Sequence, residues 1–111
     1  LVISGEFGRT PKVDWEAPWN GGRGHYGKAF SHFVAGGGFR GGHVVGSTNL
    51  RGEEVATRPI YPWDLTASIY ELLGIDFNSK LPTPDGKTEF FSPLADSSIK
   101  VQSGGLLREI M

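Results

Sequence analysis

The sequence of 111 residues contains no cysteine, which excludes disulfide bonds, thiolate zinc sites and a cysteine nucleophile. It also has little net charge, with 11 basic and 12 acidic residues and a formal net charge of −1. This balance gives no electrostatic reason to expect nucleic acid or an anionic membrane surface as a partner. No apolar run approaches the roughly 20 residues needed to cross a bilayer, so we expect no membrane span.

Glycine, in contrast, is abundant, because it accounts for 17 of the 111 residues, about twice its average share. The glycines have no strict period and gather at residues 21–27, 36–42 and 104–105, where we expect tight turns and close backbone approaches. The length fits one domain. Because the chain starts without Met inside an apolar segment, we expect residues 1–111 to be a single partial domain of a longer protein.

Three short segments are predicted to be strands. Residues 1–3 are apolar at consecutive positions, which is typical of a central strand covered on both faces. Residues 30–35 and 43–46 are predicted as the second and third strands, and the glycine-rich turn between them favours a hairpin. Residues 47–57 are polar and residues 76–87 contain two prolines and the turn pair Asp85-Gly86, so both segments are predicted to be loops.

Residues 62–73 carry the clearest helical pattern. Pro62 suits the first helical turn, Asp64 suits the positive end of the helix, and Gly74 is a good C-terminal stop. The spacing i, i+4, i+7, i+8 predicts one apolar face, which consists of Leu65, Ile69, Leu72 and Leu73.

The C-terminal third has weaker signals. Phe90 and Phe91 either begin a short strand or anchor the chain. Further on, Ile99 and Val101 alternate weakly with polar residues. A final apolar cluster is formed by Leu106, Leu107 and Ile110.

The turn at residues 4–9 follows the first predicted strand, and open α/β sheets bind their ligands outside the carboxyl ends of strands. Glu6 in this turn is either a solvated carboxylate that caps a backbone N–H or a metal ligand. His25 has glycines nearby on both sides, so its imidazole is either an accessible metal ligand or an exposed loop side chain. Arg9 either binds a phosphate or sulfate oxygen or pairs with Glu6 or Asp14. A catalytic metal usually takes three protein ligands, so further ligands would have to come from upstream residues.

The remaining candidates favour structural roles. His32 and His43 lie in or beside apolar segments and are predicted to be satisfied structural histidines, and Lys28 is predicted to be solvated. The glycines at 36–38 lack the Gly-Lys-Ser/Thr ending of a phosphate-binding loop. Trp15 and Trp19 either stack on a sugar or another ligand or, as is commoner, anchor their loop.

Four motifs carry a resemblance to a known family. They are GEFGRTP at residues 5–11, GRGHY at 22–26, AGGGFRGG at 35–42, and the segment 64–76 that starts with Asp-Leu and ends with Leu-Gly-Ile-Asp. With these motifs the chain resembles the C-terminal part of the domain of unknown function 1501 family, in the alkaline phosphatase and sulfatase superfamily. Family members commonly have Arg-Asp-His-Trp where this chain has Arg23-Gly24-His25-Tyr26, so Gly24 replaces a carboxylate that could bind or support a metal.

This resemblance implies an α/β fold, of which the chain would supply the C-terminal portion of a three-layer α/β/α sandwich on a mainly parallel sheet. It implies that Glu6 and His25 take the places of two metal ligands for a divalent ion (zinc, calcium or magnesium), with Arg9 as a substrate-binding group. The nucleophile would lie upstream, and the isolated chain would be inactive. The implied partners are the remainder of the parent chain and a small-molecule ester, and the family suggests an exported or periplasmic protein.

The resemblance leaves two functions open. One is hydrolysis of a phosphate or sulfate ester by the parent protein. The other is a non-catalytic binding or surface-assembly domain that keeps the fold, a hypothesis that Gly24 favours. A truncated gene product without a role of its own is a third possibility.

Overall fold

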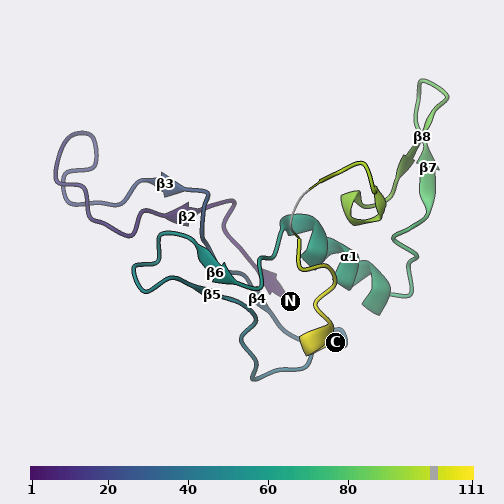
Figure 1. Cartoon of the computed structure of the whole chain (residues 1–111), viewed down its shortest axis with the longest axis horizontal. Helices are drawn as coiled ribbons and strands as arrows, with labels where there is room; N and C mark the ends of the chain where they lie inside the picture. Colours follow the sequence, from purple (N-terminus) through teal and green to yellow (C-terminus); the bar gives the residue numbers. More distant parts are fainter. Residues whose placement is uncertain (101–102) are drawn as a thin grey trace. The chain divides into compact units, whose positions relative to one another are not determined.

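The computed structural model describes residues 1–100 and 103–111, which form a mixed α/β chain. Within these residues one α-helix is accompanied by small antiparallel sheets of two strands each, paired as β1–β4, β2–β3, β5–β6 and β7–β8 (Figure 1). The elements are β1 (Val2–Ile3), β2 (Gly8–Arg9), β3 (His25–Tyr26), β4 (Phe33–Val34), β5 (Ser47–Thr48), β6 (Val55–Thr57), α1 (Pro62–Leu72), β7 (Lys80–Pro82), β8 (Thr88–Phe90) and the 3₁₀ turns η1 (Pro93–Ala95) and η2 (Arg108–Ile110).

The chain divides into two compact units, which we describe separately. Unit 1 consists of Leu1–Ala35 and Gly46–Arg58. Unit 2 consists of Gly36–Val45 and Pro59–Met111. The three sheets built from β1 to β6 therefore belong to unit 1, whereas α1, the β7–β8 hairpin and both 3₁₀ turns belong to unit 2. No helix among the described residues is long and apolar enough to cross a bilayer.

In unit 1, β1 pairs with β4 rather than standing at the centre of a sheet. Val2 lies opposite Val34 in an antiparallel register, and the Leu1 amino group donates to the carbonyl of Ala35 at 2.9 Å. Val2 and Ile3 are 47% and 58% exposed, so the prediction of a buried central strand was wrong. A two-stranded ribbon buries little side-chain surface by itself. The predicted hairpin partner of β4, residues 43–46, is not a strand in the structure.

The β5–β6 hairpin replaces a predicted loop. Ser47 lies opposite Thr57, and their hydroxyls share a hydrogen bond of 2.7 Å. The turn is closed by Asn49, whose side-chain oxygen accepts from the backbone N–H of Glu53 at 2.9 Å. An asparagine side chain can replace a backbone acceptor in this way. The segment was predicted to be a loop because its residues are polar. The hydroxyl of Tyr26 on β3 donates to the carbonyl of Glu53, which ties the hairpin to β3.

In unit 2, α1 confirms the predicted helix and its start at Pro62, and it ends at Leu72, one residue before the predicted end. Pro62 is the first helical residue, and the Asp64 carboxylate accepts from the backbone N–H of Tyr61 at 2.8 Å. At the other end Gly74 has φ = +75°, a left-handed conformation that suits glycine. The N–H groups of Gly74 and Ile75 donate to the carbonyls of Glu71 and Tyr70 at 3.0 and 2.8 Å, the two bonds of a Schellman motif.

The buried face of α1 differs from the predicted stripe. Leu65 is 8% exposed, but Leu73 is 65% exposed and therefore lies off the buried face. The buried face also contains Asp64, Ala67 and Ser68, each with no exposed area. The apolar side chains buried with Leu65 and Ala67 among the described residues are Leu107 and Ile110, two of the three residues of the predicted C-terminal apolar cluster, so the core of unit 2 joins α1 to the C-terminal segment.

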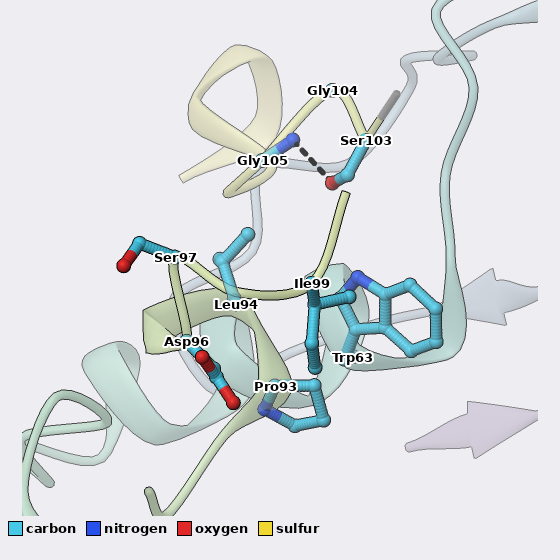
Figure 2. Close-up of a pocket in the computed structure, with 9 residues that line it drawn as sticks. All are labelled: Trp63, Pro93, Leu94, Asp96, Ser97, Ile99, Ser103, Gly104 and Gly105. Atoms are coloured by element: carbon cyan, nitrogen blue, oxygen red, sulfur yellow. Dashed lines mark hydrogen bonds between the residues drawn. The ribbon is translucent and has the colours of Figure 1, made fainter. Parts of the chain in front are cut away.

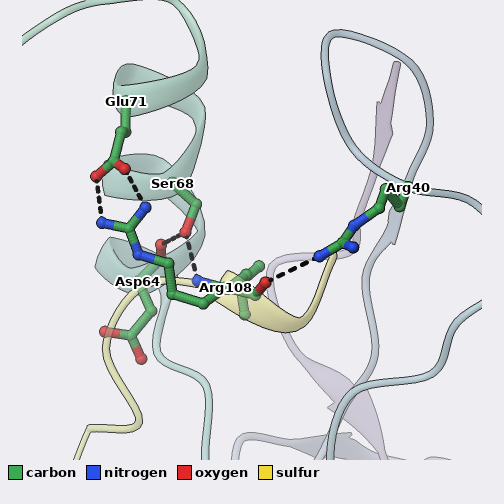
Figure 3. Close-up of polar contacts among 6 residues, drawn as sticks. Arg40, Asp64, Ser68, Glu71 and Arg108 are labelled. Atoms are coloured by element: carbon green, nitrogen blue, oxygen red, sulfur yellow. Dashed lines mark hydrogen bonds and ion pairs between the residues drawn. The ribbon is translucent and has the colours of Figure 1, made fainter. Parts of the chain in front are cut away.

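Polar contacts hold this C-terminal segment (Figure 3). The Ser68 hydroxyl donates to the Asp64 carbonyl at 2.7 Å and accepts from the Leu107 N–H at 2.8 Å. Arg108 pairs with Glu71 through both terminal nitrogens, one of them at 2.9 Å. The Arg108 carbonyl accepts from the Arg40 guanidinium at 3.4 Å. Residues from three separate stretches of the sequence therefore form one network around α1.

The β7–β8 hairpin occupies part of a second predicted loop. Lys80 lies opposite Phe90, and the Lys80 ammonium lies 4.5 Å from the centre of the Phe90 ring. Phe90 is thus the last residue of β8, rather than the start of a strand as one of the two alternatives had predicted. Phe91 packs edge-on against Tyr70 of α1 at 4.7 Å. Ile99 and Val101 were predicted to alternate weakly with polar residues, but Val101 lies outside the described residues.

Candidate functional site

The pairing of β2 with β3 brings the two predicted metal-ligand segments together. Arg9 lies opposite His25 in the antiparallel register, although 16 positions separate them in the sequence. Phe7, the residue after Glu6, stacks on the His25 imidazole with ring centres 4.0 Å apart and planes tilted by 32°. Glu6 and His25 are both exposed. The turn that carries Glu6 therefore lies against the strand that carries His25.

Arg9 makes contacts other than the ion pairs considered from the sequence. Its guanidinium carbon lies 5.7 Å from the centre of the Phe7 ring, a cation–π distance. One terminal nitrogen also donates to the carbonyl of Arg23 at 3.4 Å. The Asp14 carboxylate instead accepts from the backbone N–H of Glu16 at 3.0 Å. Arg9 is exposed, so its guanidinium faces solvent beside His25.

The loop between β2 and β3 places an indole beside the imidazole. The Trp19 and His25 ring centres are 6.0 Å apart, with planes tilted by 56°. Gly24 is buried beneath the indole, and a Cβ added there would lie 3.4 Å from the Trp19 ring. The loop is closed by the Asp14–Gly22 bridge, in which the N–H of Asp14 donates to the Gly22 carbonyl at 2.9 Å. Trp19 therefore anchors the loop and borders the candidate site.

The aromatic surroundings of His25 were not predicted from the sequence. Phe7 was part of a motif, but its ring had no assigned role. Phe7 lies in the bend before β2 rather than on the strand, so no strand periodicity pointed to its contact with His25. The contact of Trp19 with His25 had no such signal either, because it depends on how the intervening loop folds.

Glu6 and His25 do not form a metal centre by themselves. Among residues 1–100 and 103–111, no three His, Asp or Glu side chains gather closely enough to hold a metal ion. A catalytic metal usually has three protein ligands. The donor types, one carboxylate and one imidazole, fit zinc or a similar ion. The pair can therefore serve a metal only as part of a larger ligand set.

The other histidines differ from the sequence prediction. The His32 ring packs edge-on against Phe30 at 4.9 Å, as a structural histidine would. Its Nδ1 atom is nevertheless buried and makes no hydrogen bond within the described residues, so its hydrogen-bonding capacity is not satisfied there. His43 is exposed and lies outside any strand. Lys28 is exposed, as predicted for a solvated lysine.

Unit 2 contains a separate concavity that the sequence analysis did not identify. A pocket of about 320 Å³ (Figure 2) is lined by Trp63, Pro93, Leu94, Asp96, Ser97, Ile99, Ser103, Gly104 and Gly105. The Ser98 hydroxyl and the Ser98 backbone N–H both donate to the Asp96 carboxylate and lower its pKa. The Ser103 hydroxyl donates to the buried Asp64 carboxylate. These polar side chains stabilise the surrounding loops, so we do not assign a ligand to the pocket.

Comparison with known proteins places the chain in a family. Residues 1–97 match the family described as "Protein of unknown function (DUF1501)". The chain belongs to this family, which confirms the predicted membership of the domain of unknown function 1501 family. Neither the curated proteins nor the solved structures include a match to the chain.

Proposed function

We propose that the chain is the C-terminal part of a metal-dependent phosphate or sulfate ester hydrolase of the alkaline phosphatase and sulfatase type. The observation that supports this function is the β2–β3 register, which puts Arg9 opposite His25 and the Glu6 turn beside both. The His25 imidazole and the Arg9 guanidinium thereby belong to facing residues of one exposed hairpin, and the turn that carries the Glu6 carboxylate lies beside it. In the parent protein this hairpin would lie at one edge of a three-layer α/β/α sandwich.

Each of the three side chains has a defined task in this proposal. A divalent ion supplies Lewis acidity toward an ester oxygen when it is bound. Glu6 and His25 would supply a carboxylate oxygen and a ring nitrogen as two of its ligands. Arg9 presents a planar fork of N–H donors that matches a phosphate or sulfate in a bidentate way. The nucleophile and the remaining ligands come from other parts of the parent protein.

One observation favours a second function. The resemblance drawn from the sequence motifs implies an aspartate at the position of Gly24, so on that resemblance one carboxylate is missing next to His25 in the sequence. A domain that has lost a ligand can keep its fold as a binding or surface-assembly module. The upstream sequence of the parent protein distinguishes the two functions. A hydrolase is expected to have an acidic pair after its first strand, followed by Ser, Thr or Cys at a helix N-terminus, and a binding module is not.

The metal content of the full-length parent protein tests the hydrolase proposal. Wild type is compared with His25→Ala and Glu6→Ala by elemental analysis after gel filtration. His43→Ala is the matched control, because His43 is also exposed but belongs to unit 2. We expect the first two variants to lose most of the bound metal and His43→Ala to retain it. A wild type without metal, or metal retained in both variants, would contradict the proposal.

A further inference from the structure

The His25 imidazole is oriented by aromatic contacts rather than by hydrogen bonds. Within residues 1–100 and 103–111 its ring makes no hydrogen bond, whereas the Phe7 ring stacks on it with ring centres 4.0 Å apart. A metal-binding histidine usually donates its second ring N–H to a carboxylate, a carbonyl or water, and this bond fixes the ring. His25 has no such protein partner in the described part of the chain, so ring packing is the contact that restricts its orientation.

Without that packing the imidazole would rotate freely. His25 is exposed, and β3 consists of His25 and Tyr26 alone. A side chain loses rotational freedom when it binds a ligand, and this loss weakens binding. A neighbouring ring that already holds the imidazole in one orientation therefore strengthens binding without contacting the ligand.

The Phe7 ring is better placed for this task than the other ring beside His25. Its plane is tilted by 32° from that of the imidazole, which is closer to a stacked than to an edge-on arrangement. The Trp19 ring centre is farther away, at 6.0 Å, and its plane is tilted by 56°. Phe7 is therefore the ring that restricts the imidazole most.

Phe7 is itself held in place by its neighbours. It directly precedes Gly8, the first residue of β2. A Cβ added at Gly8 would collide with the Ala29 carbonyl and lie 2.9 Å from the Phe30 Cβ, so the backbone is packed against the following chain and leaves no room for a side chain. The Arg9 guanidinium carbon lies 5.7 Å from the centre of the Phe7 ring, which gives that ring a second contact.

We propose that Phe7 is a positioning residue of the candidate site, which holds the His25 imidazole in one orientation and thereby strengthens the binding of a divalent ion by that ring. The inference rests on the proposed function, in which His25 is one of the metal ligands. Phe7 has a hydrocarbon side chain and cannot bind the ion itself. Its effect on the ion is therefore indirect and acts through the order of the imidazole.

The order of the imidazole is measured first, without metal. NMR spectra of the full-length parent protein with isotope-labelled histidine rings are recorded in EDTA, and His25→Gln assigns the His25 signals. Ring protons that lie over an aromatic face are shifted upfield, so we expect this shift for His25 in wild type. Phe7→Leu keeps an apolar side chain but removes the ring, and it should remove most of the shift. Phe7→Tyr keeps the ring and should retain the shift.

Zinc affinity then tests whether this order matters to the ion. It is measured on the same proteins by competition with a chromophoric chelator. We expect Phe7→Leu to weaken zinc binding at least about threefold, because the imidazole must then be ordered during binding, and Phe7→Tyr to bind zinc as wild type does. Unchanged zinc affinity in a Phe7→Leu protein whose imidazole has lost its order would overturn the inference.

A matched control and a folding check distinguish positioning from a general effect on stability. Phe33→Leu removes an exposed ring of unit 1 that does not contact His25, so it should change neither measurement. The Thr10 N–H donates to the Gly24 carbonyl across the β2–β3 hairpin at 3.0 Å, and slow exchange of this amide shows that the hairpin is intact. Loss of its protection in Phe7→Leu overturns the inference, because Phe7 is then a structural residue of the hairpin.

The inference and the proposed function fail in different ways. A wild type that binds zinc but has the same His25 signals as Phe7→Leu refutes the inference alone and leaves the metal site in place. A wild type that binds no zinc contradicts the hydrolase and the inference together, because the inference needs a metal at His25.

Discussion

Ser68 shows what one hydroxyl contributes to unit 2. It has no exposed area, donates to the Asp64 carbonyl at 2.7 Å and accepts from the Leu107 N–H at 2.8 Å. Ser68→Ala leaves this N–H without its partner in a buried place, and an unsatisfied buried donor costs about 1–3 kcal/mol. We therefore expect Ser68→Ala to lower the free energy of unfolding by about that amount, measured by urea denaturation followed by circular dichroism.

Thr66→Ala is the matched control for this variant. The Thr66 hydroxyl also donates to the carbonyl four residues earlier, that of Pro62, at 2.9 Å, but Thr66 is exposed. Water can replace its bond and alanine is the better helix former, so stability should stay within about 0.5 kcal/mol or rise. A loss as large as that of Ser68→Ala would show that the bond to Leu107 is unimportant.

Position 24 tests whether the candidate metal site lacks a carboxylate ligand. A Cβ at this position would lie 3.4 Å from the Trp19 ring, at van der Waals contact. Under the proposed function Gly24→Asp adds a carboxylate next to His25. We expect the variant to bind zinc several-fold more tightly than wild type, because carboxylate oxygen is a zinc ligand. Competition with a chromophoric chelator measures the change.

Gly24→Asn distinguishes metal binding by the new carboxylate from the effect of placing any side chain of that size in the loop. Its side chain has the size of aspartate but no charge, so any effect of filling the loop appears in both variants. Zinc affinity should rise only for Gly24→Asp. If both variants behave alike, position 24 does not face a metal and the site proposed around His25 loses its main support.

At the scale of the element, α1 depends on one glycine at its end. Gly74 has φ = +75°, and nothing lies within 4 Å of an added Cβ. The cost of Gly74→Ala is therefore conformational rather than steric, and a left-handed alanine costs about 1 kcal/mol. We expect that loss in the free energy of unfolding by urea titration. Gly41→Ala is the control, because an added Cβ at Gly41 also has nothing within 4 Å but Gly41 has no positive φ. We expect no loss of the free energy of unfolding in this variant.

The same residues explain why α1 could be predicted from sequence. Its start at Pro62, its acidic first turn and its stop at Gly74 are local signals within a dozen residues. The buried face was predicted less well, because Leu73 lies off it and Asp64 lies on it. Burial of Asp64 depends on Ser103, whose hydroxyl donates to its carboxylate from far along the chain. A contact between residues so far apart cannot be predicted from the periodicity of the helix.

The strands were predicted poorly for a related physical reason. Each has two or three residues, too few for alternation to be visible, and the partner of β4 is β1 rather than the nearby apolar segment at residues 43–46. At the candidate site, Glu6, Arg9 and His25 were identified from residue type and neighbouring glycines. That Arg9 and His25 are opposite each other follows from a register fixed by the whole intervening loop.

At the scale of the whole molecule, burial is distributed unevenly between the two units. Every buried apolar side chain among the described residues lies in unit 2, namely Leu65, Ala67, Leu107 and Ile110. In unit 1 large apolar side chains are exposed, including Leu1, Ile3 and Phe33 at 74%, 58% and 55%. Hydrophobic burial is the dominant favourable contribution to folding, so unit 1 has much less of it per residue.

This difference predicts which backbone amides exchange with solvent first. Amide protection follows the free energy of local opening, which is small where few apolar contacts are buried. In hydrogen exchange followed by mass spectrometry, we expect peptides from β1 and β4 to exchange at least about tenfold faster than peptides from α1. Equal protection in a dilute sample would contradict the prediction. Protection of β1 and β4 that appears only at high protein concentration would instead mean that a second copy covers their apolar side chains, because association stabilises by mass action.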